Sequence, residues 1–391
     1  MGNAPHWLQE KTLQQFFAAT HAAGGEARVV GGAVRDFLLG REGGDVDVAS
    51  SLKPEDTMAI AAAAGWKAVP TGIAHGTVTL VLPERVVEVT TLRRDVETDG
   101  RHATVAYTDD FAEDAARRDF TMNALSMDAQ GSIHDYYRGR EDIDARQVRF
   151  IGDAATRIAE DGLRILRYFR FMAQLGFAGD AQALAACEAQ RAMVANLSGE
   201  RIAQEMRKLL VAAAPAEALG QMAGIGLPEY LTESPWYHDH LLQLLALEKA
   251  HDMAPSAWVR LLAMIAPEFR TATASWIGER WKLSRNERAL LAVLAGQTTT
   301  VDAATTKEWL RAHERAVVQQ CLLLWAVDTG EDVGALLRLA QTWNVPALPV
   351  TAKDLIARGH SEGRALGDAL RALEERWIKS DYTLSKAELL A

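Results

Sequence analysis

An Asp-x-Asp pair in a short β-branched run constrains this chain more than any other feature. Asp45 and Asp47 lie in the segment 44–49, where Val46 and Val48 occupy the alternate positions. If this segment is a strand, the valines enter the core and both carboxylates project from the other side. Two carboxylates on one side of a rigid element can hold two Mg²⁺ ions about 4 Å apart, one at an attacking hydroxyl and one at a leaving pyrophosphate. The pattern therefore indicates nucleotidyl transfer.

A glycine pair precedes this segment. The mainly apolar run 27–30 is followed by Gly31 and Gly32, and a helix is expected to begin near Ala33. Glycine lets the backbone approach phosphate oxygens closely, and the first amides of a helix attract anions. We therefore expect the glycine pair to lie against nucleotide phosphates, with an ordinary chain turn as the simpler alternative.

The pattern of elements changes near residue 150. Before this point, short β-branched runs at 78–82 and 85–92 are separated by helical segments, which is typical of an α/β domain. After it, helical periodicity prevails, with breaks at points such as 232–235 and 344–349. The sequence predicts an α/β catalytic domain over 1–150 and an all-helical remainder.

Composition and charge limit the classes of protein to which this chain can belong. A formal net charge of −10 and a pI near 5.6 argue against bulk attraction to nucleic acid, although Arg164, Arg167 and Arg170 recur every three residues as a local basic stripe. Charge interrupts every apolar stretch well before about 18 residues, and no signal-peptide pattern is present, which predicts no membrane contact and a cytoplasmic location. Cys187 and Cys321 fit buried thiols in a reducing compartment.

A third carboxylate lies in the run 85–91. Val87 and Val89 face one way there, and Glu88 faces the other. A neighbouring strand could bring Glu88 to the aspartate pair as a further acidic group. Alternatively, Glu88 could belong to the polar side of an edge strand. The sequence alone favours neither arrangement.

The segment 116–125 combines cations, an acid and an amide. Arg117 or Arg118 could clamp a triphosphate through two parallel hydrogen bonds, which lysine cannot copy, or could form a helix-capping salt bridge with Asp119. Asn123 could orient a sugar hydroxyl or cap a turn. Both residue types thus have a nucleotide-binding and a structural interpretation.

The segment 160–171 carries a sharper argument. On a helix, Asp161, Arg164 and Arg167 lie on one face, whereas Leu163 and Leu166 face the core. One acceptor and one fork of donors on a rigid face can pair with the edge of a nucleobase. The alternative is a surface salt bridge between positions i and i+3, worth roughly a few tenths of a kcal/mol.

In this order, the motifs resemble those of class II tRNA nucleotidyltransferases (CCA-adding enzymes) and bacterial poly(A) polymerases, over residues 29–210. The matching patterns are GGxVRDxLLG at 31–40, DxD at 45–47, RRDFTxNA at 117–124, EDxLRxxR at 160–167 and LSxERI at 197–202. The resemblance implies a polymerase-β-like nucleotidyltransferase head of α/β class over 1–150, followed by an all-α neck over 151–215 and an all-α body and tail over 216–391.

The resemblance also implies roles for individual residues. Asp45 and Asp47 would be metal ligands, and Glu88 would occupy a less constant acidic position at the catalytic centre. Asp161 and Arg164 would select CTP or ATP without a nucleic-acid template. Other contacts to the nucleotide would come from Gly31, Gly32, Arg35, Arg118, Arg167 and Arg170. The implied cofactor is Mg²⁺ and the implied partners are the tRNA acceptor end, CTP and ATP, with no stable protein partner.

Three further segments bear on the subfamily. The polar stretch 94–102 looks like the flexible loop that CCA-adding enzymes retain, and the end of the chain at 382–388 lacks the basic run usual in poly(A) polymerases. The histidines at 238, 240 and 251 are interpreted as surface or helix-end residues rather than as part of a phosphohydrolase site. CCA addition is the leading prediction. A poly(A) polymerase, an A-adding enzyme and a non-catalytic RNA-binding relative are the alternatives.

Overall fold

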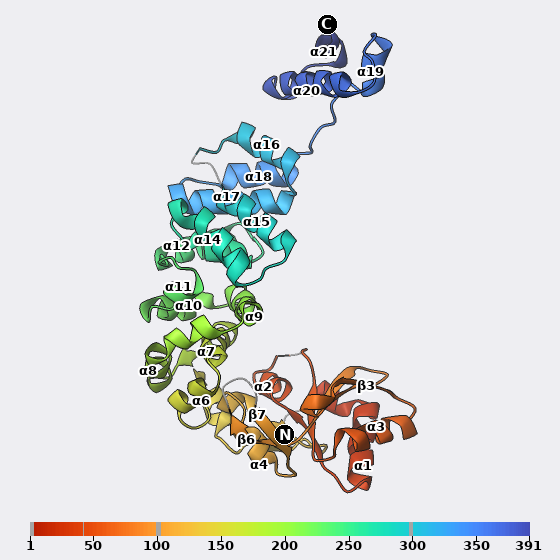
Figure 1. Cartoon of the computed structure of the whole chain (residues 1–391), viewed down its shortest axis with the longest axis vertical. Coiled ribbons are helices and arrows are strands. Elements are labelled where there is room, and N and C mark those ends of the chain that lie inside the picture. The colour runs from red at the N-terminus through yellow and green to blue at the C-terminus, as the bar shows by residue number, and fades with distance from the viewer. Residues whose placement is uncertain (1–3, 42, 99–102, 297–299) are drawn as a thin grey trace. The chain divides into compact units, whose positions relative to one another are not determined.

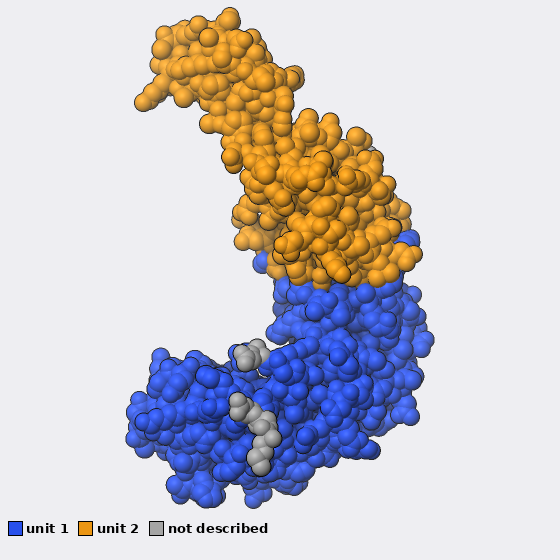
Figure 2. Space-filling view, turned by 180° about the vertical axis from the view of Figure 1, so that it is seen from behind, with its two compact units in different colours: residues 1–238, 275–284 blue, residues 239–274, 285–391 orange. Residues whose placement is uncertain are grey.

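The chain forms two compact units, which are described separately. A computed structural model describes residues 4–41, 43–98, 103–296 and 300–391. The first unit comprises residues 1–238 with 275–284, and the second comprises 239–274 with 285–391 (Figure 2). Within the described ranges, every helix is too short or too polar to span a membrane.

A mixed sheet forms the centre of the N-terminal region (Figure 1). Its strands are β1 (Ala27–Val30), β2 (Asp47–Ser50), β3 (Lys67–Gly72), β4 (Thr77–Val81), β5 (Val86–Thr91), β8 (Ser126–Met127) and β9 (Ile133–His134). They lie in the order β3-β4-β5-β2-β1-β8-β9. The neighbours β2 and β5 run parallel, and the other neighbouring pairs run antiparallel. The predicted strands at 78–82 and 85–92 correspond to β4 and β5.

Helices cover this sheet and connect its strands. Helix α3 packs against β3, β4 and β5, and α1 packs against β1 and α3 (Figure 1). Leu13 and Phe16 of α1 are fully buried, as expected for apolar residues on one helical face. The helices up to residue 150 are η1 (His6–Gln9), α1 (Lys11–Ala22), α2 (Gly32–Leu38), α3 (Pro54–Ala63), η2 (Ile73–His75), α4 (Phe111–Ala116), η3 (Thr121–Asn123) and α5 (Gly139–Asp144).

A β-hairpin stands where the sequence resemblance suggested a flexible loop. Strand β6 (Arg93–Thr98) pairs antiparallel with β7 (Ala103–Tyr107), and the register shifts between Asp95 and Glu97. The predicted loop 94–102 therefore consists largely of strand, and residues 99–102 of it lie outside the described residues. Each of the two segments contains both Val and Thr, which are β-branched residues that favour strands.

The remainder of the first unit is mainly helical, as predicted. Helix α7 packs against α9 and α10, and a short parallel pair joins β10 to β11. Cys187 is a buried free thiol, and burial raises its pKa to about 12. The elements are β10 (Gln147–Val148), α6 (Ala154–Glu160), α7 (Leu163–Leu175), β11 (Ala178–Gly179), α8 (Ala181–Ala189), η4 (Arg191–Asn196), α9 (Gly199–Leu210), α10 (Pro215–Gly224) and α11 (Pro228–Leu231).

The second unit is built from helices around α17, which packs against α13, α15, α16 and α18. A separate apolar cluster, which includes Leu355, Leu366 and Trp377, joins α19 and α20 near the end of the chain. The helices from residue 238 onward are α12 (His238–Ala250), α13 (Ala257–Ala263), α14 (Pro267–Arg280), α15 (Arg285–Ala295), α16 (Ala303–Ala312), α17 (Arg315–Thr329), α18 (Gly334–Thr342), α19 (Ala352–Ala357), α20 (Arg364–Lys379) and α21 (Lys386–Leu390). Of these, the first residue of α12 and residues 275–280 of α14 belong to the first unit. His238 and His251 lie at the two ends of α12, in agreement with the helix-end interpretation.

Candidate active site

A polar cavity of about 680 Å³ lies in the first unit. Its residues come from the glycine turn after β1, from β2, from the segments around α4 and η3, and from α7. Its volume is within the range of pockets that hold small molecules. Its lining residues are Gly31, Gly32, Arg35, Asp47, Arg93, Arg117, Arg118, Asp119, Asn123, Asp161, Arg164, Arg167, Arg170, Phe171 and Gln174.

The glycine turn requires glycine at its first position. Gly31 has a φ of 71°, and its backbone N–H donates to the carbonyl oxygen of Leu125 at 2.9 Å. A Cβ at this position would lie 3.1 Å from Nη1 of Arg118, so position 31 favours glycine for both conformation and space. Helix α2 begins at Gly32, one residue before the predicted start.

The aspartate pair is confirmed in its alternation but not in its strand boundary. Val46 and Val48 are buried, while Asp45 and Asp47 are exposed. The strand was predicted over 44–49, whereas β2 begins only at Asp47. Asp45 therefore lies in the preceding loop, because the glycine-rich stretch before it has positive φ angles that do not continue a strand.

Glu88 stands beside the aspartates. In the parallel register of β2 and β5, Asp47 is the direct partner of Glu88, so the two side chains project from the same face. Strand β5 has neighbours on both sides, and the edge-strand interpretation of Glu88 is therefore wrong. The register brings Glu88 to the aspartate pair as a third acidic residue.

The electrostatics of this group suit a cation. Asp47 is accessible at its surface, but the protein around it partly desolvates the carboxylate and so raises its pKa. The nearby carboxylates of Glu88 and Asp45 raise this pKa further, while Arg118 opposes them. Among the described residues, no group of three or more His, Cys, Asp and Glu side chains is arranged to hold a metal ion by itself. One or two carboxylates, with the other positions left to substrate phosphates and water, are what Mg²⁺ usually receives from a protein. The donor set therefore fits Mg²⁺ bound together with a nucleotide.

Both arginines of segment 116–125 line the cavity, and Arg118 pairs with Asp114. Arg118 donates to Oδ2 of Asp114 at 3.2 Å and to the backbone carbonyl of Asn123 at 3.4 Å, and it still lines the cavity. Arg117 also lines the cavity, and its carbonyl oxygen accepts from Arg157 at 2.6 Å. Arg118 therefore pairs with Asp114 where the sequence offered a capping salt bridge with Asp119.

The buried carboxylate of Asp119 holds other side chains of the cavity wall in place. Its Oδ2 accepts from Nε of Arg167 at 2.7 Å, and its Oδ1 accepts from the amide of Asn123 at 3.1 Å. Asn123 in turn accepts from Arg35 at 2.7 Å. Burial on its own would raise the pKa of Asp119, but Arg167, Asn123 and the N–H of Phe120 outweigh it and lower the pKa. One buried carboxylate thus fixes two arginines, one of them through Asn123.

Asp161 and Arg164 do not share one helix as predicted. Asp161 ends α6 with an extended conformation, and α7 begins only at Leu163. The carboxylate of Asp161 accepts from the backbone N–H of Leu163 at 3.0 Å and from Arg201 at 2.6 Å. Arg164 donates to Glu160 and to the carbonyl of Arg157. Both residues line the cavity, but they do not form the i,i+3 salt bridge that was the alternative.

A buried glutamate organises the two remaining arginines. Glu205 of α9 accepts from Nε of Arg170 at 2.5 Å and lies 3.7 Å from Arg167. Arg170 is itself buried and stacks over the ring of Phe171 at 4.0 Å. Arg170 therefore reaches the cavity as a paired, immobilised group. Sequence reasoning missed Glu205, although an acid among the apolar residues Ile202 and Leu209 on one face of a helix is a recognisable signal.

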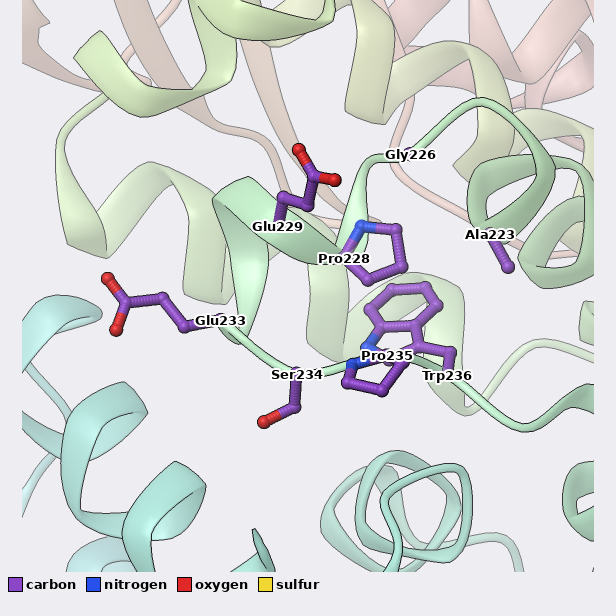
Figure 3. Close-up of a pocket in the computed structure, with 8 residues that line it drawn as sticks. All are labelled: Ala223, Gly226, Pro228, Glu229, Glu233, Ser234, Pro235 and Trp236. Atoms are coloured by element: carbon purple, nitrogen blue, oxygen red, sulfur yellow. The ribbon is translucent and has the colours of Figure 1, made fainter.

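A second cavity of about 550 Å³ contains none of the predicted site residues. Figure 3 shows Pro228 beside the ring of Trp236, with the carboxylates of Glu229 and Glu233 turned away from that ring. The indole N–H of Trp236 donates to Thr232 at 2.9 Å. The residues that line this cavity include no arginine or lysine, so they offer no cation to the phosphates of a nucleoside triphosphate.

Two family models match the chain. Residues 27–149 match the poly A polymerase head domain, and residues 176–236 match a model described as the probable RNA and SrmB-binding site of polymerase A. The mitochondrial CCA tRNA nucleotidyltransferase 1 of Danio rerio is 35% identical, over 94% of this chain and 86% of that protein. The CCA-adding enzyme of Levilactobacillus brevis is 34% identical, over 94% of each chain.

Solved structures give the same picture. The structure of the Bacillus stearothermophilus CCA-adding enzyme in complex with CTP has a TM-score of 0.72 and 30% identity, over 94% of this chain and 92% of that one. The Thermotoga maritima CCA-adding enzyme complexed with tRNA has a TM-score of 0.72 at 17% identity, over 99% of this chain and 97% of that one, which is a likeness of fold.

Proposed function

The chain belongs to the family of CCA-adding tRNA nucleotidyltransferases, and we propose that it adds CCA to the 3′ end of tRNA from CTP and ATP with release of pyrophosphate. The observation that carries this proposal is the cavity in which Asp47, with Glu88 beside it, faces an arginine-rich wall. Carboxylates that can hold a metal and donors that can hold a triphosphate are the two parts that nucleotidyl transfer needs.

Family membership supports the use of a divalent metal, and we propose Mg²⁺ as the ion. Asp45 and Asp47 would hold it, with Glu88 adjacent. When bound, Mg²⁺ supplies activation of the tRNA 3′-hydroxyl and neutralisation of the leaving pyrophosphate. Arg118 and the backbone at Gly32 would bind the phosphates, and Gly31, whose own N–H donates to Leu125, would let the backbone approach them closely. Arg118 is held in place by Asp114 and by the carbonyl of Asn123.

Selection of the nucleotide is assigned to Asp161 and Arg164. Cytosine and adenine each present an exocyclic amino donor, at N4 and N6, whereas the corresponding groups of uracil and guanine are carbonyl acceptors. The carboxylate of Asp161 can only accept hydrogen bonds, and the guanidinium of Arg164 can only donate them. One acceptor and one donor at the cavity wall would therefore accept CTP and ATP and disfavour UTP and GTP.

The remaining parts of the proposal concern the chain as a whole. We propose the division into a head over 1–150, a neck over 151–215 and a body and tail over 216–391, in which the helical parts grip the tRNA acceptor end by shape and backbone contacts. Arg35, Arg167 and Arg170 would complete the nucleotide pocket. The proposed location is cytoplasmic, although curated relatives include mitochondrial enzymes.

A primer-extension assay tests the function. The protein is incubated with tRNA transcripts that end before CCA, after the first C and after the second C, with CTP and ATP supplied separately and together. CCA addition predicts C incorporation on the first two transcripts and one A on the third. Chelation by EDTA should stop addition, and excess Mg²⁺ should restore it. Long A tracts would indicate a poly(A) polymerase, and a failure to add C would indicate an A-adding enzyme.

A further inference from the structure

Arg201 holds the carboxylate of Asp161 from a different helix. Its guanidinium, on the first turn of α9, donates to Oδ2 of Asp161 at 2.6 Å, while Oδ1 accepts from the backbone N–H of Leu163 at 3.0 Å. The partners are 40 positions apart in the sequence. The two side chains are 45% and 30% exposed, respectively, so the pair lies where a substrate can reach it.

The turn that carries Asp161 is fixed on its other side as well. A Cβ at Gly162 would lie 2.9 Å from Cβ of Met193, which means that the turn packs directly against η4. One helical turn after Arg201, Glu205 pairs with Arg170 and Arg167. One face of α9 therefore supports both kinds of side chain in the cavity wall. Its Arg201 holds the acceptor Asp161, and its Glu205 holds the donors Arg167 and Arg170.

We propose that Arg201 is a positioning residue for nucleotide selection, which fixes the orientation of the Asp161 carboxylate so that it can accept from the amino group of cytosine or adenine. The proposal rests on the proposed function. An ionised carboxylate offers about four acceptor positions, and the contacts to Arg201 and Leu163 use one on each oxygen. Acceptor positions on both oxygens are left for a base, and a carboxylate, which only accepts hydrogen bonds, cannot pair with a carbonyl oxygen of uracil or guanine.

A structural role would give a different result. An exposed ion pair of this kind contributes little to stability, because water screens it and two long side chains must be ordered. Loss of Arg201 should therefore leave the fold intact but let the carboxylate of Asp161 rotate. A rotating acceptor loses discrimination between bases more than it loses the chemical step, since the metal ligands and phosphate contacts are elsewhere.

The experiment compares three variants with wild type. Arg201→Gln removes the charge, Arg201→Lys retains it, and Lys282→Gln is the matched control. Lys282 pairs with Glu200, the residue before Arg201, at 2.8 Å, and both partners are exposed. For each protein, kcat/KM is measured for CTP and UTP on a tRNA that ends before CCA. The ratio cancels any change in tRNA affinity, because both nucleotides use the same primer.

We expect Arg201→Gln to lower the CTP-to-UTP ratio by about 10-fold, within the range of one base contact, with an unchanged unfolding midpoint. Arg201→Lys should recover part of the ratio, and Lys282→Gln should leave it at the wild-type value. A wild-type ratio in Arg201→Gln, alongside a reduced ratio in Asp161→Ala, would overturn the proposal. A lower KM for CTP in Arg201→Gln, with the CTP-to-UTP ratio unchanged, would also overturn it, because Arg201 would then compete with the base for Asp161. A wild-type protein that adds no C would instead refute the proposed function.

Discussion

The acidic and the basic side of the cavity differ in whether their charged side chains already have partners in the protein. On the acidic side, Asp47 lines the cavity with Asp45 and Glu88 nearby, and within the described structure none of the three carboxylates has an ion-pair partner. On the basic side, the guanidinium groups are held by acids of the chain, as Arg167 is by Asp119 and Arg164 is by Glu160. The acidic side is incomplete without an external cation, whereas the basic side is already organised.

This difference has a physical reason. Carboxylates close together repel one another, and the raised pKa of Asp47 reflects partial desolvation and that repulsion, which a divalent ion would relieve. Arginine side chains are long, and ordering them during the reaction would cost entropy. Fixing them beforehand with Asp119 and Glu205 gives a triphosphate donors that need little reorganisation.

The largest effect is expected from substitutions on the acidic side. Replacement of Asp45 or Asp47 by Ala should lower nucleotide addition by at least about 10³-fold, because several kcal/mol of charge stabilisation are lost. Affinity for tRNA should stay within a few fold, since the helical regions hold the RNA. Single-turnover extension and filter binding measure the two quantities. Near-normal turnover in either variant would refute the metal assignment.

A smaller effect is expected when the basic side loses its anchor. Asp119→Asn should lower the free energy of unfolding by about 2 kcal/mol at pH 7, the value of hydrogen bonds to a charged group. Because the pKa of Asp119 is lowered in the folded state, its stabilisation is complete above the unfolded value near 3.9 and is lost as the pH falls through the folded value. Urea unfolding from pH 3 to 8 should show the difference between the two proteins shrinking below about pH 4. A difference independent of pH would contradict this role.

The smallest effect concerns the turn that joins the two helices of the basic side. Gly162→Ala places a Cβ 2.9 Å from Cβ of Met193, so the turn must shift by a few tenths of an ångström. We expect a loss of roughly 3- to 10-fold in kcat/KM for CTP, as misplacement of positioning groups costs rate. Gly224→Ala is the control, because a Cβ there meets nothing within 4 Å. Equal activity of the two variants would show that the turn tolerates the displacement.

The two sides also differ in how far the sequence predicted them. The acidic side follows from local patterns, since alternation in a strand places Asp45 and Asp47 opposite Val46 and Val48 whatever the rest of the fold is. Even there, the start of the strand was placed too early, because positive φ angles at Gly43 and Gly44 were not predicted. The paired state of the arginines could not be predicted, because their partners lie far away in the sequence.

Asp161 illustrates the limit. Helical spacing predicted a face shared with Arg164, but the extended conformation of Asp161 separates α6 from α7, and Asp161 pairs with Arg201 instead. The sequence by itself determined the residue types of the site, the burial of the strands and the helical character after residue 150, because these depend on chemistry and periodicity over a few residues. The tertiary structure alone decided that Glu88 lies beside Asp47 and that α9 pairs with Asp161 and Arg170. Strand register and helix packing join residues that local periodicity cannot relate.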